Sequence, residues 1–151
     1  MMISTKGRYA LRLLIDIAEH QRQGYIRLRD VAHRQGISEK YLEIIVRTLV
    51  QEDYLTGVRG KGGGYRLSRD PEDYNIRKVL EAAEGPLAPV VCLVEGQDCP
   101  RMSGCPTLPL WQGLDQAIAR YLEGFTLADL LGCTRNEDAP PEAAPPTEPG
   151  E

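Results

Sequence analysis

The most constraining feature of this sequence is a three-residue connection, Gly36-Ile37-Ser38, between two amphipathic segments. The upstream segment, 28–35, keeps its apolar residues at helical spacing, and so does the downstream segment from Glu39 to Asp53. Glycine readily adopts the left-handed conformation that ends a helix, and serine is a preferred cap for the next one. We therefore predict two helices joined by a tight turn, which is the pattern of a helix-turn-helix.

The second of these helices is predicted to have an apolar inner face and a polar outer face. The inner face comprises Leu42, Ile45, Val46 and Leu49. In helix-turn-helix proteins, outward residues near the start of the second helix enter the major groove of DNA. The residues predicted here to contact DNA are Ser38, Glu39, Lys40, Tyr41 and Glu43, with Arg47 one turn further along. The alternative is a helical hairpin with a solvated outer face, and the two helices alone do not decide between these.

A predicted β-hairpin follows the two helices. Segments 54–59 and 65–68 read as short strands, and the glycine-rich stretch 60–64 between them allows the unusual torsions of a hairpin tip. Arg59, Lys61 and Arg66 make this hairpin basic, as expected of a wing that contacts phosphates or the minor groove. A phosphate-binding loop is excluded, because that motif needs Ser or Thr after its lysine and Gly62 follows Lys61.

The charge distribution supports contact with nucleic acid, although the whole chain carries a net charge of −4. Residues 1–70 contain 13 Lys and Arg against 8 Asp and Glu, whereas residues 71–133 contain 4 against 9. A basic N-terminal half is the electrostatic pattern expected where DNA is bound. The alternative is a chance asymmetry of solvated charges.

Four more helices are predicted outside the helix-turn-helix. A helix capped at Ser4-Thr5 precedes the helix-turn-helix, another runs from Ile76 to Glu84, and a long helix begins at Thr107, which could cap it. The apolar stripe of the long helix is Leu110, Trp111, Leu114, Ala117, Ile118, Tyr121, Leu122 and Phe125. A second copy of the chain is its expected partner, and packing onto its own winged domain is the alternative. Residues 126–129 resemble a capping box that opens a last short helix.

The predicted fold is mainly α with a small β-hairpin wing: a winged helix-turn-helix domain plus a long dimerisation helix. We assign 1–85 to the DNA-binding domain, 86–106 to a cysteine-bearing sensor loop, and 107–132 to the dimerisation helix and the short helix after it. Residues 133–151 are rich in proline and acidic residues and are expected to be disordered. No apolar run is long enough to span a bilayer, so a cytoplasmic protein without a membrane partner is expected.

Cys92, Cys99 and Cys105 lie within fourteen residues of one another, whereas the rest of the chain contains only Cys133. In a reducing cytosol, clustered cysteines are more often metal ligands or reactive thiols than disulfides. Three thiolates on one loop could hold an iron–sulfur cluster or zinc, and each of these centres needs four ligands. Metal-free redox thiols and inert cysteines are the alternatives. Cys133 is interpreted as a lone peripheral thiol.

Several motifs in the same order resemble the Rrf-type winged-helix regulators, the family of IscR, NsrR and CymR. The matching segments are 4–10, 36–38 with 41–43, 58–65, and the three cysteines before Leu110-Trp111. The resemblance covers about residues 1–132. It implies a homodimer that binds a palindromic operator in double-stranded DNA, and in many members a [2Fe–2S] or [4Fe–4S] cluster that controls this binding. It also implies that Glu43 tunes sequence choice and that Arg59 enters the minor groove.

The sequence departs from these relatives at the fourth ligand of the cluster. In IscR-like members a histidine follows the last cysteine by three residues, and this position is Leu108 here. In NsrR-like members an aspartate of the partner subunit can serve, and the corresponding position is Arg8. Asp98, Glu95, Cys133, a partner carboxylate or an exogenous ligand are left as candidates, whereas His20 and His33 are expected to be exposed.

The predicted function is that of a transcriptional regulator, not an enzyme, whose DNA binding responds to a cluster or to the redox state of the three cysteines. A CymR-like regulator without a cluster, controlled by thiol oxidation or a partner protein, is the alternative. A small iron–sulfur or thiol redox protein is disfavoured, since no C-x-x-C pair is present and a basic wing would then have no role.

Overall fold

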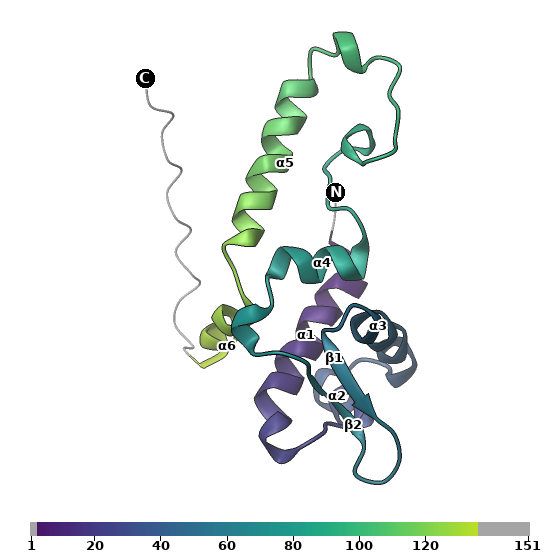
Figure 1. The fold of residues 1–151 in the computed structure, drawn as a ribbon, viewed down its shortest axis with the longest axis vertical. Coiled ribbons are helices and arrows are strands. Elements are labelled where there is room, and N and C mark those ends of the chain that lie inside the picture. Colours follow the sequence, from purple (N-terminus) through teal and green to yellow (C-terminus); the bar gives the residue numbers. More distant parts are fainter. Residues whose placement is uncertain (1–2, 136–151) are drawn as a thin grey trace.

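The computed structural model describes residues 3–135, which form a mainly helical chain with one small hairpin (Figure 1). This agrees with the predicted fold class. The main elements, in chain order, are α1 Thr5–His20, α2 Leu28–Gln35, α3 Glu39–Gln51, β1 Leu55–Val58, β2 Gly64–Leu67, α4 Ile76–Glu84, α5 Leu108–Glu123 and α6 Leu127–Arg135. Short 3₁₀ turns join them: η1 Gln21–Gln23, η2 Pro71–Asp73, η3 Val91–Leu93 and η4 Met102–Gly104.

The predicted helix-turn-helix is present. Gly36 ends α2 in the left-handed conformation, with φ of 63°, and the Ser38 hydroxyl accepts a hydrogen bond of 3.1 Å from the backbone N–H of Tyr41. The predicted inner face of α3 is buried throughout. The helix ends at Gln51, two residues earlier than predicted, because Asp53 adopts a left-handed backbone with φ of 57°.

The wing is an antiparallel pair in which Leu55 lies opposite Leu67 and Val58 opposite Gly64. Residue Ile26 adds a short third edge, since it exchanges two backbone hydrogen bonds of 2.8 Å with Tyr65. Gly64 has φ of 146°, and a Cβ there would collide with the Ile26 carbonyl. Glycine at this position therefore lets the wing lie against the segment before α2.

Asp16 is a buried carboxylate that ties α1 to α2. It is 1 % exposed and accepts hydrogen bonds from the Arg34 guanidinium, the closest at 2.6 Å, and from the Gln35 amide at 2.9 Å. The hydrogen bond between Arg34 and Asp16, together with the negative charge of Asp16, raises the pKa of Arg34. The His20 ring donates from Nδ1 to the Asp16 carbonyl at 2.7 Å, so His20 is partly buried and structural rather than simply exposed as predicted.

Glu84, the last residue of α4, holds the start of α1. Its Oε1 accepts hydrogen bonds of 2.8 Å from the Ser4 backbone N–H, the Ser4 hydroxyl and the Gly7 backbone N–H. A carboxylate at this place also interacts favourably with the positive end of the α1 dipole. The next residues of the chain, from Gly85 onward, lead into the cysteine loop, so this contact joins the loop's base to the DNA-binding domain.

The end of the described chain packs back onto the winged domain. Leu127 of α6 is fully buried in the same core as α1 and α3, and its N–H donates to the Tyr74 carbonyl at 3.0 Å. The predicted capping box is confirmed by reciprocal hydrogen bonds between Thr126 and Asp129. The DNA-binding core thus draws on a helix that follows the long one in sequence. The tail predicted to be disordered was 133–151, but residues 133–135 belong to α6, so the prediction is wrong for these three; the rest of the tail lies outside the described residues.

The long helix α5 contacts its own chain mainly at its C-terminal end, where Leu122 and Phe125 pack against Ile76, Leu80 and Leu87. It has no buried residue, and Leu110, Leu114 and Tyr121 of its apolar stripe are 62 %, 42 % and 54 % exposed. Figure 1 shows α5 extending away from the winged domain. Of the described helices, none is both long enough and apolar enough to cross a bilayer.

Candidate DNA-binding surface and cysteine loop

The start of α3 presents a polar, exposed surface. Ser38, Glu39, Lys40, Glu43 and Arg47 are all exposed, as expected for residues that meet a ligand outside the domain. Ser38 is also committed to capping the helix through its hydroxyl. These side chains stand on a helix whose opposite face is fixed in the core, so their spacing is rigid.

Tyr41 differs from the other α3 residues predicted to contact DNA because it is half-buried. Its ring packs edge-on against Tyr9 of α1, with centroids 5.8 Å apart and an interplanar angle of 84°. Tyr9 also contacts the Arg12 guanidinium, which lies over the Tyr9 ring at 5.2 Å from its centroid. Tyr41 therefore links α3 to α1 through its ring.

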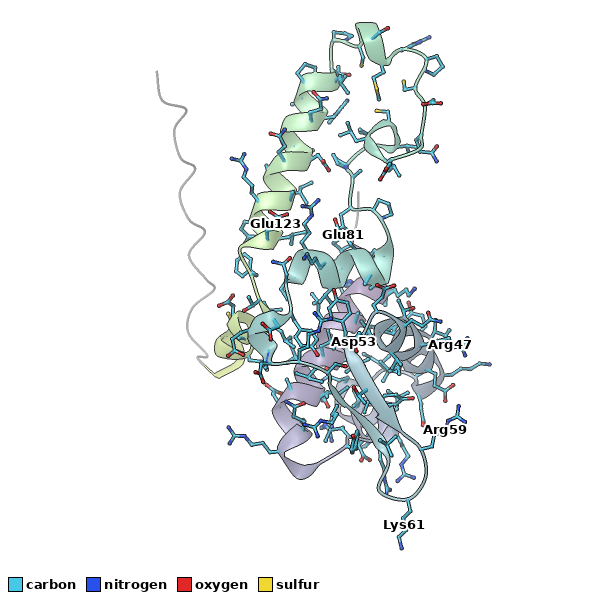
Figure 2. The ribbon with its side chains drawn as sticks, viewed as in Figure 1. Arg47, Asp53, Arg59, Lys61, Glu81 and Glu123 are labelled. Atoms are coloured by element: carbon cyan, nitrogen blue, oxygen red, sulfur yellow. The ribbon has the colours of Figure 1, made fainter. Side chains whose placement is uncertain are left out.

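The wing adds two exposed cations near this helix. Arg59 directly follows β1, and Lys61 stands at the tip among glycines. Figure 2 shows Arg47 of α3 and Arg59 on the same side of the molecule, with Lys61 pointing away from the wing tip. Gly60 and Gly62, with φ of 90° and 76°, shape this tip and leave its backbone uncovered by side chains. A helix and a basic loop on the same side of the molecule can contact the major groove and a neighbouring minor groove or phosphate.

The cysteine loop lies at the opposite end of the molecule from the wing (Figure 1). Cys92 lies in η3, the carbonyl of Cys99 accepts from Met102 at 3.1 Å ahead of η4, and Cys105 directly follows η4. All three side chains are half-buried free thiols. Between Leu87 and the start of α5, η3 and η4 are the only helical turns that the structure describes, and the backbone hydrogen bonds described within this loop join residues three positions apart, such as Gln97 N–H to the Val94 carbonyl at 3.1 Å.

Three thiols are suitable donors for an iron–sulfur cluster, but the loop conformation does not gather them. Within residues 3–135, no three Cys, His, Asp or Glu side chains lie together as a group that could hold a metal ion. As placed, the residues therefore do not fit a cluster, and one could bind only after the loop rearranges.

Cys105 has the most clearly perturbed surroundings of the three. The Thr107 hydroxyl lies 3.3 Å from its Sγ, and this hydrogen bond, with the backbone N–H groups of Thr107 and Leu108, lowers the pKa of the thiol. Thr107 directly precedes α5, at the N-cap position as predicted, but it does not cap the helix through its side chain. Its backbone is already helical, with φ of −93° and ψ of −7°, and its side chain makes no capping hydrogen bond.

Of the positions considered for a fourth ligand, Glu95 and Asp98 are exposed residues of the loop itself, whereas Cys133 lies outside it. Cys133 lies on α6, at the far end of α5 from the loop (Figure 1), and a 16-residue helix spans about 24 Å. Glu95 is exposed and lines a pocket of about 360 Å³ between the loop, α4 and α5, together with Glu81 and Asp115. Within one chain, Cys133 is therefore too remote to complete a site with the three loop cysteines.

Two residues of structural consequence near these surfaces, Asp16 and Glu84, were not singled out from the sequence. Asp16 interrupts the apolar stripe of α1 between Leu13 and Ile17, and this interruption was the available signal for a buried ion pair. Glu84 gave no such signal, because its contact with Ser4 joins residues 80 positions apart.

Comparison with known proteins agrees with this arrangement. Residues 3–132 match the family described as "Rrf2: Iron-dependent Transcriptional regulator". The chain is 43 % identical over 131 residues to protein rrf2 of Nitratidesulfovibrio vulgaris, which covers 87 % of each protein.

Two solved structures are similar in fold and sequence. One is IscR of T. potens, with a TM-score of 0.71, 32 % identity, and coverage of 91 % of this chain and 90 % of that one. The other is CymR (YrzC), the global cysteine regulator of B. subtilis, with a TM-score of 0.71, 31 % identity, and coverage of 87 % and 97 %. The match spans nearly all the described residues, and this chain belongs to the Rrf2 family of transcriptional regulators.

Proposed function

We propose that the chain is a homodimeric, cytoplasmic regulator that binds a palindromic operator in double-stranded DNA and whose affinity is set by the state of the Cys92, Cys99 and Cys105 loop. The observation that carries this proposal is the pairing, in one chain, of an exposed basic reading surface with a three-thiol loop at the opposite end. We assign these roles to residues 1–85, 86–106 and 107–132, with the exception that Leu127 of α6 packs in the core of the DNA-binding domain.

In the proposed complex, the start of α3 enters the major groove and the wing lies beside it. Lys40, Arg47 and Lys61 are exposed cations that would neutralise phosphates or contact acceptor groups on bases. Glu43 would accept from a cytosine amino group and repel misplaced phosphates. Arg59 would enter the minor groove, where the negative potential is strongest when the groove is narrow.

The exposed stripe of α5 supports the proposed dimer. Leu110, Leu114 and Tyr121 form an apolar surface that the described residues of the same chain leave open. A second copy would cover it and place two reading helices at a fixed separation, as a two-fold operator requires. Sedimentation equilibrium should give twice the chain mass, and a monomer at micromolar concentration would contradict this part of the proposal.

Two chemical states of the loop are open. An iron–sulfur cluster is supported by the family's description as iron-dependent and by the similarity to IscR. Control by thiol oxidation or by a partner protein, without a cluster, is supported by a loop conformation in which no three metal-binding side chains of the described residues lie together, and by the similarity to CymR.

Anaerobic purification separates these alternatives. A cluster should give visible absorbance with bound iron and sulfide, and both should disappear when all three loop cysteines are replaced by serine. Iron-free protein would exclude the cluster. Selection from a library of randomised duplexes tests the function itself, since failure to enrich any sequence would contradict a regulator.

We infer that the loop acts on the reading helix through Glu84, Tyr9 and Tyr41. Glu84 lies at the loop's base and holds the start of α1 through Ser4 and Gly7. Tyr9, in the first turns of α1, packs on Tyr41 of α3.

Replacing Glu84 with alanine should cost about 1 kcal/mol of stability, as for loss of a helix cap. It should also reduce the difference in DNA affinity between oxidised and reduced protein. Lys78→Ala, at an exposed position of the same helix that does not line the pocket beside the loop, is the control and should leave that difference unchanged. An unchanged difference in Glu84→Ala would exclude this route.

A further inference from the structure

The winged domain exposes few large apolar side chains, and all of them lie on its reading elements. Among residues 3–85, the large apolar side chains classed as exposed are Ile44, Val50 and Val58. Ile44 and Val50 belong to α3, and Val58 to β1. Single exposed apolar residues are common on protein surfaces, so Val50 and Val58 need no partner, whereas Ile44 lies among the charged residues predicted to contact DNA.

Of the three, Ile44 lies among the α3 residues that are predicted to contact DNA. It lies four residues after Lys40 and three before Arg47, and Glu43 is its neighbour, so these four side chains share roughly 100° of the helix circumference. Ile44 is 50 % exposed and is the one apolar member of this charged stripe. A long side chain on a helix leans toward the helix N-terminus, which here is the end proposed to enter the groove.

The charged neighbours restrict what Ile44 can contact. An apolar protein groove that covered Ile44 would also remove Lys40, Glu43 and Arg47 from water without pairing their charges, which is costly. A DNA major groove instead offers phosphates and base edges to the charges, and one apolar group to the isoleucine. That group is the C5 methyl of thymine, which no other DNA base carries there.

We propose that Ile44 is a specificity-determining residue that contacts a thymine methyl group in each operator half-site. The proposal rests on the proposed DNA-binding function and adds a base preference to it. Burying one methyl group is worth about a four-fold change in affinity, so each half-site should prefer thymine at one position by roughly this factor.

The test replaces single thymines with deoxyuridine, which removes only the methyl group. The full-length protein is first used to select its operator from a randomised duplex library, and each thymine of that operator is then exchanged in turn. For the unaltered protein, one exchange per half-site should weaken binding about four-fold. For Ile44→Ala, the same exchange should have no effect, although the variant still binds the operator.

Val50→Ala is the matched control, because Val50 is a similarly exposed apolar residue about 120° away around the same helix. In Val50→Ala, replacing the contacted thymine with deoxyuridine should still weaken binding about four-fold. Alanine favours helix, so melting curves should show both variants folded. Uniform tolerance of uracil by the unaltered protein, or a uracil penalty that persists in Ile44→Ala, would overturn the assignment while leaving operator binding intact. Failure of the unaltered protein to select any sequence would instead refute DNA binding, and the assignment with it.

Discussion

Replacement of Arg34 with alanine is expected to lower the free energy of unfolding by about 3 kcal/mol, the largest single effect on stability that we predict. Arg34 donates three hydrogen bonds to the two carboxylate oxygens of Asp16, and Asp16 is almost fully buried between α1 and α2. Without the guanidinium, the carboxylate keeps only the Gln35 amide and the nearby His20 ring to offset its desolvation. Urea denaturation followed by circular dichroism measures the change.

Two further variants separate the buried charge from simple loss of a surface arginine. Arg22→Ala removes an exposed arginine just after α1 and should change stability by less than about 0.5 kcal/mol. The double replacement Asp16→Leu with Arg34→Met removes both charges and should recover much of the loss, because no unpaired carboxylate is then buried. Equal stability of Arg34→Ala and Arg22→Ala would show that Asp16 does not depend on this partner.

Replacement of Arg59 with alanine is expected to weaken operator binding by roughly 10-fold to 100-fold, because the wing would lose its proposed contact in the minor groove. Arg59 is exposed on the same side of the molecule as Arg47 (Figure 2), so its removal should leave the fold unchanged. Fluorescence anisotropy with labelled operator, over a series of salt concentrations, measures both the affinity and the number of ions released on binding.

Arg120→Ala is the control for a loss of positive charge alone. Arg120 is exposed on α5, away from α3 and the wing, and its replacement should change affinity less than about two-fold. Arg59→Lys should recover binding only in part, because an ammonium group lacks the planar fork of a guanidinium. Equal affinities of Arg59→Ala and Arg120→Ala would contradict the proposed docking of the wing.

The sequence predicted the elements whose signals are local. Helical spacing around Leu42 and Ile45, the Gly36 and Ser38 caps, and the glycines of the wing were sufficient for the helix-turn-helix and its hairpin. Where two local signals competed, the outcome was less certain: Asp53 entered a left-handed conformation and ended α3 early, and Thr107 bonded to Cys105 instead of capping α5.

Long-range contacts could not be predicted in the same way. Nothing near Leu127 indicates that it fills the core beside α1 and α3, and nothing near Glu84 indicates that it accepts from Ser4 and Gly7. The arrangement of the three cysteines was equally open, because an irregular loop has no periodicity from which side-chain directions follow.

Control of DNA binding at the cysteine loop is tested most directly by the operator affinity of one anaerobic preparation, measured as purified and again after thiol oxidation or iron removal. We predict an affinity change of at least about ten-fold in the unaltered protein, within the usual range of allosteric coupling, and none in the variant with serine at Cys92, Cys99 and Cys105. Equal affinity in every state of the unaltered protein would contradict control at the loop, and an equal change in the serine variant would place the sensor elsewhere.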